Sequence, residues 1–352
     1  MTDRLTIRRP DDWHVHFRDG AMLDAVAPWT ARQFARAIVM PNLMPPVTTV
    51  AAAEAYRERI LAAVGAALGP DAGFTPLMTC YLTDNADEDE IRRGFEQGVF
   101  AAVKFYPAGA TTNSDAGVTD VKRVYGVFET MQEIGMPLLV HGEVTDPEVD
   151  VFDREAVYIE RVLTPLIDNF PELKVVFEHV TTEDAVDFVN ARHGQAPGTI
   201  GATITAHHLV INRTNIFRGG IRPHLYCLPI AKRERHRLAL REAATSGAPA
   251  FFLGTDTAPH ARAAKETDCG CAGIFSAPAA LEIYAQVFDE EGSLDNFEAF
   301  ASLNGPKFYG LDPNSETVTL QRGAADVPEA VTTTEGDAVR VFGAEDTGWR
   351  IA

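Results

Sequence analysis

The stretch Asp12-Trp13-His14-Val15-His16-Phe17-Arg18-Asp19, near the start of the chain, decides how the rest of the sequence is interpreted. Alternate residues of a β-strand point to the same side, so the imidazoles of His14 and His16 would project together. Neutral imidazole is a frequent zinc ligand, and the pair therefore offers two ligands to one ion. Such a pair also occurs on ordinary protein surfaces, so its meaning depends on what the other strands contribute.

Short apolar segments rich in strand formers recur along the chain, with helix-like segments between them. The predicted strands are Trp13–Phe17, Ala37–Met40, Thr75–Tyr81, Ala101–Phe105, Pro137–Val140, Lys174–Glu178, Thr199–Thr205 and Pro249–Gly254. The predicted helices include Ala51–Leu68, Asp87–Gln97, Val121–Ile134, Glu155–Asn169, Glu183–Ala191, Arg233–Ser246 and Pro278–Phe288. Alternation of strand and helix predicts a parallel sheet, and about eight such units suit a closed (β/α)₈ TIM barrel.

We expect a single domain over residues 1–352, with a barrel core at about 11–310 and a C-terminal extension at about 311–352. The extension is rich in Thr, Val, Gly and Asp and lacks helical periodicity, which predicts short strands or loops packed on the barrel. A doubly wound open sheet is the alternative architecture, but no glycine-rich GxGxxG turn follows the first predicted strand.

The composition limits the classes of partner. The 352 residues are 46% hydrophobic and 23% charged, as in globular proteins, and the formal net charge is −19. This charge argues against a nucleic-acid or anionic-membrane partner, because phosphates would be repelled. The start of the chain has no apolar signal segment, no apolar run approaches the roughly 20 residues of a membrane span, and four cysteines do not predict a disulfide framework. We therefore expect a cytoplasmic, soluble protein.

Ionisable side chains stand at the C-terminal ends of the predicted strands, where the active sites of TIM barrels are built. Lys104 and His141 are 37 residues apart, and His141 and His179 are 38 apart, which is one βα unit each. Each residue alone has an ordinary structural explanation, but the set predicts a metal centre at one barrel mouth. The candidate ligands are His14, His16, Lys104, His141, His179 and Asp256.

Lys104 fits a metal centre only after modification, because an ammonium group has no lone pair and is repelled by cations. Carbamylation by carbon dioxide would convert it to N6-carboxylysine, an anion with two oxygens that can bridge two ions. We predict this modification from the position of the lysine. A bare amine at Lys104 in the zinc-loaded protein, detected by mass, would contradict it.

With these residues the sequence resembles the amidohydrolase superfamily and, within it, the dihydroorotases of the free-standing bacterial type. The resemblance runs from about Asp11 to Tyr309 and includes every expected ligand. It rests on the segments Asp12–Asp19, Met40–Leu43, Val103–Pro107, Leu139–Glu143, Phe177–His179, His224–Pro229, Gly254–His260, Cys269–Gly273 and Asn304–Pro306.

The resemblance implies two Zn²⁺ ions per subunit and the reversible cyclisation of N-carbamoyl-L-aspartate to L-dihydroorotate and water, in pyrimidine (UMP) biosynthesis. The implied ligand sets are His14, His16 and Asp256 for one ion, and His141 and His179 for the other, bridged by carbamylated Lys104 and a hydroxide. In ring opening the hydroxide would be the nucleophile, and Asp256 would be the general acid and base. A homodimer is also implied.

The substrate of such an enzyme is a small anion, so local cations must hold it against the negative charge of the protein. The resemblance assigns the substrate carboxylate to Arg18, Asn42 and His260, and the ring edge to backbone groups near Leu228 and Ala272. A surface ion pair with Asp19 is the alternative role for Arg18. By the same resemblance, the loop at residues 108–114 is a lid in which Thr111 and Thr112 hydrogen-bond the substrate and exclude water.

Several alternatives stay open at this point. Hydantoinases, dihydropyrimidinases and allantoinases share the metal ligands, but their uncharged rings lack the carboxylate that Arg18 would bind. A non-catalytic barrel and a metal-free phosphate-binding isomerase are less favoured, because the ligands are intact and Asp256 and His260 occupy the expected phosphate loop. Cys269 and Cys271 could bind zinc, but no matching second pair exists, so an unpaired structural or loop role is favoured. For His207 and His208 we expect a structural or supporting role.

Overall fold

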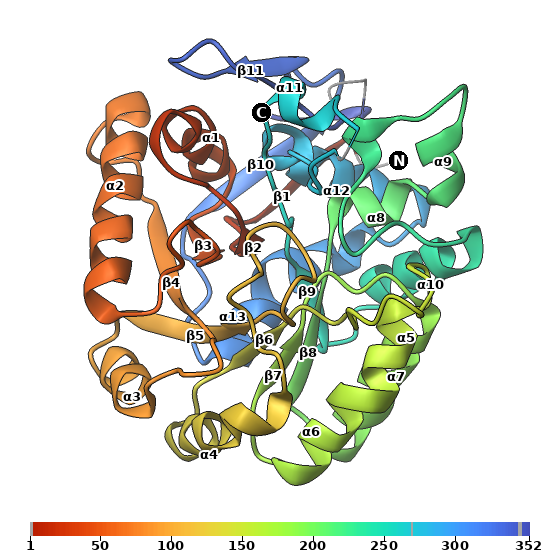
Figure 1. The fold of residues 1–352 in the computed structure, drawn as a ribbon. Coiled ribbons are helices and arrows are strands. Elements are labelled where there is room, and N and C mark those ends of the chain that lie inside the picture. Colours follow the sequence, from red (N-terminus) through yellow and green to blue (C-terminus); the bar gives the residue numbers. More distant parts are fainter. Residues whose placement is uncertain (1–2, 269, 344–346) are drawn as a thin grey trace.

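The structure is a computed structural model that describes residues 3–268, 270–343 and 347–352. A sheet of eight parallel strands curls into a barrel at its centre (Figure 1). The strands are β2 (Asp12–Val15), β3 (Arg36–Val39), β4 (Thr75–Tyr81), β5 (Phe100–Phe105), β6 (Leu138–Val140), β7 (Val175–Phe177), β8 (Ile200–Ile204) and β9 (Phe251–Leu253). Strands consecutive in sequence are neighbours throughout the sheet. The predicted (β/α)₈ barrel is confirmed, and the doubly wound alternative is wrong because its strand order would reverse.

The barrel closes between its first and last strands through the segment that follows β9. Val15 forms a parallel bridge with Thr257, and the His16 amide donates to the Thr257 carbonyl at 2.9 Å. The buried Asp12 carboxylate reinforces the junction by accepting hydrogen bonds from the amide and the hydroxyl of Thr255, at 2.8 and 2.6 Å. This closure brings the ends of β2 and β9 side by side.

Helices connect the strands and cover the outside of the barrel (Figure 1). They are α1 (Gly20–Gln33), α2 (Val50–Leu68), α3 (Glu88–Glu96), α4 (Tyr125–Ile134), α5 (Arg154–Tyr158), α6 (Thr164–Asn169), α7 (Glu183–Gln195), α8 (Ala206–Val210), α9 (Arg213–Phe217), α10 (Glu234–Thr245), α11 (Arg262–Lys265), α12 (Ala280–Glu290) and α13 (Asn304–Tyr309). The hydroxyls of Thr49 and Thr182 accept amide hydrogen bonds in the first turns of α2 and α7, which fixes where these helices begin. The helix predicted over Glu155–Asn169 contains a π-helical turn at Ile159–Leu163.

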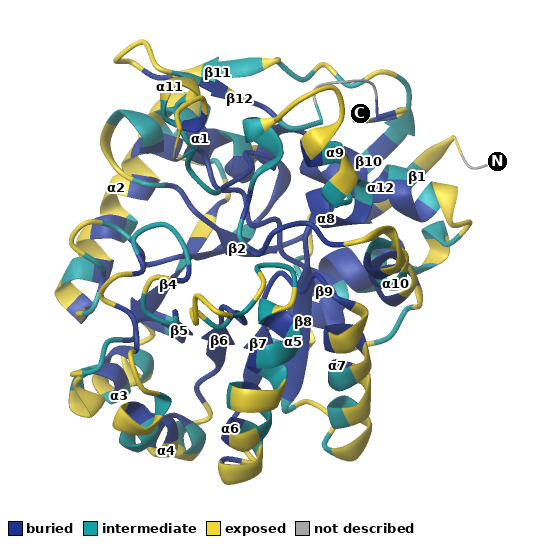
Figure 2. Ribbon diagram, turned by 45° about the vertical axis from the view of Figure 1, so that its right-hand side comes forward, coloured by how far each residue is buried: buried dark blue, intermediate teal, exposed yellow. Residues whose placement is uncertain are grey.

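Buried side chains fill both sides of the strands. In Figure 2 the barrel strands are mostly dark blue, and many exposed residues lie on the outer faces of helices such as α3, α6 and α7. Inside the barrel an apolar layer lies on the N-terminal side of the predicted ligands. It consists of Trp13, Ile38, Met40, Ala102, Leu139, Val176, Phe252 and Phe308. Trp13 stacks on Tyr309 with ring centroids 4.3 Å apart, so α13 closes this end of the barrel.

The two terminal segments pair with each other beside the barrel. Strand β1 (Arg4–Arg8) pairs antiparallel with β10 (Thr317–Arg322), which also pairs with β13 (Trp349–Ile351). Strands β11 (Ala330–Thr332) and β12 (Ala338–Arg340) form a separate pair. The prediction of short strands packed on the barrel is confirmed, and its partner strand β1 was not foreseen.

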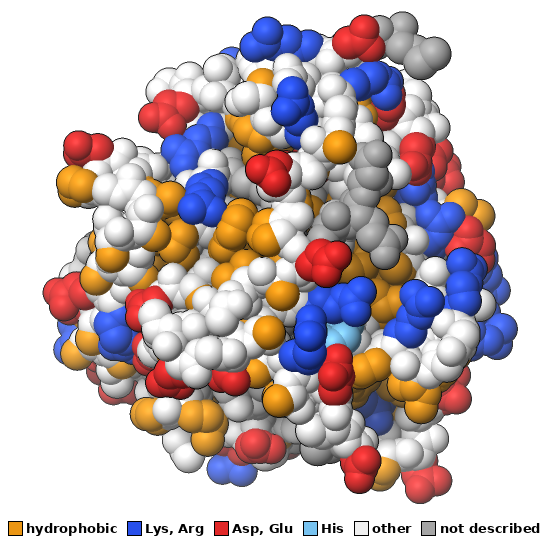
Figure 3. Space-filling model, turned by 90° about the horizontal axis from the view of Figure 1, so that it is seen from above, with side chains coloured by type: hydrophobic (Ala, Val, Ile, Leu, Met, Phe, Trp, Pro, Cys, Tyr) orange, Lys and Arg blue, Asp and Glu red, His pale blue; other side chains and the backbone are white. Residues whose placement is uncertain are grey.

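The surface shows both signs of charge. On the face drawn in Figure 3, Lys and Arg side chains are interspersed with Asp and Glu, so the negative charge is not concentrated there. Among the described residues, no helix has the length and apolar character that crossing a bilayer requires.

Candidate metal centre and substrate pocket

The structure brings the six predicted metal ligands into one cluster at the mouth of the barrel. Each lies at or just after the C-terminal end of its strand, and none of the six is more than 8% exposed. They are His14 and His16 from the first barrel strand, Lys104, His141 and His179 from β5, β6 and β7, and Asp256 after β9. The predicted convergence of these residues is therefore what the fold produces.

His14, His16 and Asp256 form a compact triangle of donor atoms. The two imidazole Nε2 atoms are 3.2 Å apart, and each lies 3.2 Å from Asp256 Oδ1. A tetrahedral zinc ion with ligands at 2.0–2.1 Å places neighbouring ligand atoms about 3.3 Å apart. The spacing and the chemistry of these three side chains therefore fit a single zinc ion.

His141 and His179 adjoin this triangle. Their ring centroids are 4.9 Å apart, and the His179 ring lies 5.0 Å from that of His14. Ligand atoms of His14, His179 and Asp256 all lie within 4.8 Å of one another. The buried His179 Nδ1 has no hydrogen-bond partner among the described residues, and a buried imidazole nitrogen of this kind is a natural ligand for a cation.

Two buried glutamates complete the cluster, and sequence analysis assigned them no role. Glu178 Oε1 lies 2.9 Å from His14 Nδ1, and Glu143 Oε2 lies 3.0 Å from His141 Nε2. A carboxylate beside the remote nitrogen of a ligand histidine fixes its tautomer and ring orientation. Both glutamates lie next to a predicted ligand in sequence, in Glu178-His179 and His141-Gly142-Glu143, which is the signal that could have identified them.

Lys104 is fully buried inside this group. Its ammonium contacts Glu178 Oε2 and lies 4.6 Å from the centre of the Tyr106 ring. Burial lowers the pKa of Lys104, although the Glu178 carboxylate opposes this shift. The amine that would react with carbon dioxide is the neutral form, which burial favours.

Charge compensation governs the protonation states at this site. Burial alone would lower the pKa of His14, but the carboxylates of Glu178 and Asp256 raise it to about 9. Burial lowers the pKa of His16 to about 4 and that of His179 well below its usual value. Burial opposes ionisation of Asp256, yet His14 holds the pKa of this carboxyl well below its usual value. The carboxylates of Glu178 and Asp256 are thus stabilised by a neighbouring cation, which here is protonated His14. A bound metal ion would take over that role.

The backbone is strained at three residues of the mouth. Arg18, His179 and Asp256 have φ values of 62°, 41° and 46°, in the left-handed region that non-glycine residues seldom adopt. Such strain is concentrated at functional sites, where the surrounding structure imposes it. Here it turns each side chain toward the pocket from a segment that has just left its strand.

Arg18 and His260 lie on one side of the pocket. Arg18 Nη2 is 3.0 Å from His260 Nε2, and its Nε donates to the Pro259 carbonyl at 3.2 Å. The buried Nη1 has no hydrogen-bond partner among the described residues, so this guanidinium retains donors for an anion. Burial, together with Arg18, lowers the pKa of His260 to about 3. The alternative ion pair between Arg18 and Asp19 is wrong, because Asp19 pairs with Arg59 at 2.9 Å.

The predicted lid lies across the pocket. Asn42 connects the two, since its Oδ1 lies 2.9 Å from His16 Nδ1 and its Nδ2 donates to the Thr112 carbonyl at 2.9 Å. The Thr112 hydroxyl contacts the Ala272 carbonyl at 3.4 Å, and both Thr111 and Thr112 line the pocket. The loop therefore joins the opposite walls of the mouth.

The remaining predicted contacts, Leu228 and Ala272, also line this pocket. Lys265, which sequence analysis did not single out, holds their loops together: its Nζ donates to the carbonyls of Tyr226, Cys271 and Gly273, each at 2.7 Å. Cys271 is a free, partly buried cysteine of this loop, as predicted, whereas Cys269 lies outside the described residues.

Comparison with known proteins identifies the family. The sequence matches the amidohydrolase family over residues 11–324. It is 63% identical to the dihydroorotase of Sphingopyxis alaskensis over 351 residues, covering 100% of both chains. It is also similar to the crystal structure of the Saccharomyces cerevisiae dihydroorotase in complex with 5-fluoroorotic acid, with a TM-score of 0.91, 32% identity, and coverage of 100% and 99% of the two chains.

A more distant likeness shows the fold alone. The L-hydantoinase of Arthrobacter aurescens has a TM-score of 0.76 but 15% identity, over 99% of this chain and 89% of the other. The match over residues 11–324 and the full-length identity to relatives show that the chain belongs to the amidohydrolase family.

Proposed function

We propose that the protein is a dihydroorotase, which interconverts N-carbamoyl-L-aspartate and L-dihydroorotate. The observation that carries this proposal is one pocket that combines a metal-ligand cluster with a partly unpaired guanidinium, Arg18. The cluster suits hydrolysis of a cyclic amide, and the guanidinium suits a substrate with a free carboxylate. Full-length relatives that carry this name support the same assignment.

We propose further that the cluster holds two zinc ions. One would bind His14, His16 and Asp256, the other His141 and His179, and carbamylated Lys104 would bridge them. Bound zinc supplies a water of lowered pKa and polarises the scissile carbonyl. Glu178 and Glu143 orient His14 and His141 through the contacts described above.

The other residues bind the substrate and move the proton. Asp256 lies beside His14 and His16 in the mouth, where its carboxylate can take a proton and deliver it to the departing ring nitrogen during ring opening. Arg18, with Asn42 and His260, would hold the substrate carboxylate. Thr111 and Thr112 would close the pocket from above and keep water away from the reacting amide.

The substrate class can be tested with a ring that lacks the carboxylate. We expect the zinc-loaded protein to turn over dihydroorotate and to leave dihydrouracil almost unchanged. Arg18→Met should lower kcat/KM for dihydroorotate by about 10²–10³-fold, the cost of leaving a charged partner unpaired. Comparable turnover of both rings by the unmodified protein would instead favour a hydantoinase or dihydropyrimidinase.

The architecture of the chain supports two further proposals. Strand β1 precedes the barrel strands in the sequence and β10 follows them, and these two strands pair with each other. We therefore propose that residues 1–352 fold as one domain. The homodimer implied by the family resemblance and the cytoplasmic location expected from the composition stay predictions, and light scattering on the purified protein tests the first.

A further inference from the structure

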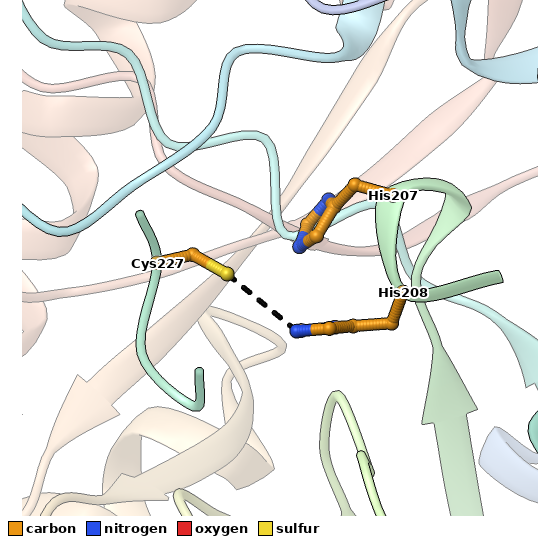
Figure 4. A group of neighbouring side chains, drawn as sticks. All are labelled: His207, His208 and Cys227. Atoms are coloured by element: carbon orange, nitrogen blue, oxygen red, sulfur yellow. Dashed lines mark hydrogen bonds between the residues drawn. The ribbon is translucent and has the colours of Figure 1, made fainter. Parts of the chain in front are cut away.

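A second group of potential metal ligands shares no residue with the ligand cluster described above. It consists of His207, His208 and Cys227, which Figure 4 shows converging from two segments. One ring nitrogen of each histidine and Cys227 Sγ all lie within 4.8 Å of one another, and all three residues are buried. Sequence analysis gave the histidines a structural or supporting role and did not connect them with Cys227.

The fold fixes the position of His208 closely. Both histidines lie in α8, which begins directly after β8, and Thr205 caps this short helix. His208 Nδ1 is 2.8 Å from Thr205 Oγ1, and its Nε2 is 3.0 Å from the Pro229 carbonyl oxygen. The same Nε2 lies 3.5 Å from Cys227 Sγ. The ring is therefore held with one edge toward the sulfur.

His207 has no comparable explanation in the folded protein. Its side chain is completely buried, and neither ring nitrogen has a hydrogen-bond partner among the described residues. Its ring lies 4.4 Å from that of His208 and 6.2 Å from that of Phe342. Burial without partners forfeits the hydrogen bonds that imidazole makes to water, so a buried ligand would account for this residue.

We propose that His207, His208 and Cys227 form a third metal site, distinct from the binuclear centre, for a zinc-like divalent cation. Two imidazole nitrogens and one thiolate are a donor set that zinc prefers. In a tetrahedral zinc site the nitrogen and sulfur ligands are about 3.5 Å apart, which matches the separation of His208 Nε2 and Cys227 Sγ. The Pro229 carbonyl oxygen, 3.3 Å from the sulfur, is a fourth donor at the same place.

Binding at this site is coupled to proton release. Zinc binds cysteine as the thiolate, so a cation at this site would displace the Cys227 proton to solvent. His208 Nε2 faces the Pro229 carbonyl oxygen, which can only accept a hydrogen bond, so this nitrogen carries the ring proton in the structure. Binding of a cation at Nε2 would require the proton to move to Nδ1, which faces Thr205 Oγ1. The Thr205 hydroxyl oxygen can accept a hydrogen bond from Nδ1 in that second tautomer.

The site would stabilise one wall of the substrate pocket. Cys227 directly precedes Leu228, which lines that pocket, whereas His207 and His208 belong to α8. A cation shared by the two segments would fasten this wall to the barrel. We expect the role of this cation to be structural.

Cobalt absorption tests the proposal independently of activity. The ligands proposed for the binuclear centre include no sulfur, so a thiolate-to-cobalt charge-transfer band reports a cysteine-containing site alone. The full-length protein is purified from cells grown with cobalt in place of zinc. We expect the band in the unmodified protein and in Cys271→Ser, a control that changes a cysteine outside the group, and its loss in Cys227→Ser.

A second variant guards against a folding defect in Cys227→Ser. His207→Gln removes ring nitrogens that have no hydrogen-bond partner in the described part of the chain, so this variant should fold. A chelator should remove its cobalt band at a concentration at least tenfold lower than the unmodified protein requires. Absence of the band in the unmodified protein, its persistence in Cys227→Ser, or unchanged chelator resistance in His207→Gln would each overturn the proposal. None of these outcomes depends on whether dihydroorotate is the substrate.

Discussion

Two layers inside the same barrel differ completely in chemistry. On β5, β6 and β7 and just beyond them, Ala102, Leu139 and Val176 belong to the apolar layer, and the side chains two residues further on are Lys104, His141 and Glu178. Alternation along a strand turns both members of each pair to the barrel interior. The same strands thus build a layer that stabilises the fold and, one step nearer the mouth, a layer of ionisable groups whose burial costs stability.

The two layers differ in the effect that burial of their side chains has on stability. Apolar side chains gain free energy on burial, whereas buried carboxylates and imidazoles need hydrogen bonds and opposite charge to be tolerated. In the mouth, the imidazole of His14 supplies the hydrogen bonds and the opposite charge to the carboxylates of Glu178 and Asp256. Variants in the two layers should therefore have separable effects: loss of activity from the mouth, and loss of stability from the apolar layer.

The largest effect is expected from the mouth itself. Asp256→Asn keeps the size of the side chain but removes the carboxylate proposed to transfer the proton. Turnover of dihydroorotate should fall by about 10³-fold, within the range typical of general acid–base catalysis. Steady-state kinetics measure this, with circular dichroism to verify folding. Activity within tenfold of the unmodified protein would remove Asp256 from the mechanism.

The apolar layer should respond in the opposite way. Leu139→Ala leaves a cavity between fully buried neighbours and should lower the free energy of unfolding by about 2–5 kcal/mol. Denaturant titration measures the loss, and metal content should stay unchanged. Leu139→Met, which nearly conserves volume, is the matched control and should cost less than about 1.5 kcal/mol. Loss of bound metal from Leu139→Ala under conditions in which the variant stays folded would show that the two layers are not separable.

Much of this architecture could be predicted from the sequence. The eight strands were recognisable because each is a short apolar run, and the ligands because they follow those runs at intervals of one βα unit. Glu178 was overlooked because it ends an apolar run and its partners, His14 and Lys104, come from other strands. Lys265 was overlooked for a similar reason, since a lysine that binds three carbonyls resembles any surface lysine in sequence.

The lid should contribute less than Asp256. Thr111→Ala combined with Thr112→Ala removes two hydroxyls, and two hydrogen bonds correspond to roughly a tenfold loss of kcat. Zinc content should be intact, because neither threonine belongs to the ligand cluster. Unchanged kinetics in the double variant would reject a role of these hydroxyls in turnover.

The smallest effect comes from a buried carboxyl away from the mouth. Glu282, on α12, is 4% exposed, and burial raises its pKa to about 7 from the usual 4.5. A folded pKa above the unfolded value means that its contribution to stability falls as pH rises from about 4.5 to 7. Glu282→Gln should therefore raise Tm by about 2–4 °C at pH 8 and by less at pH 5, as measured by calorimetry. Equal shifts at both pH values would contradict this account.

The ionisable layer at the mouth is proposed to bind zinc and thereby to perform the chemistry. The most direct measurement follows conversion of carbamoyl aspartate to dihydroorotate, and the reverse, before and after chelation and on return of zinc. We expect turnover to vanish when zinc is removed from the mouth and to return with two zinc ions bound there. Undiminished turnover in the stripped protein, or no turnover with both ions restored, would contradict the claim.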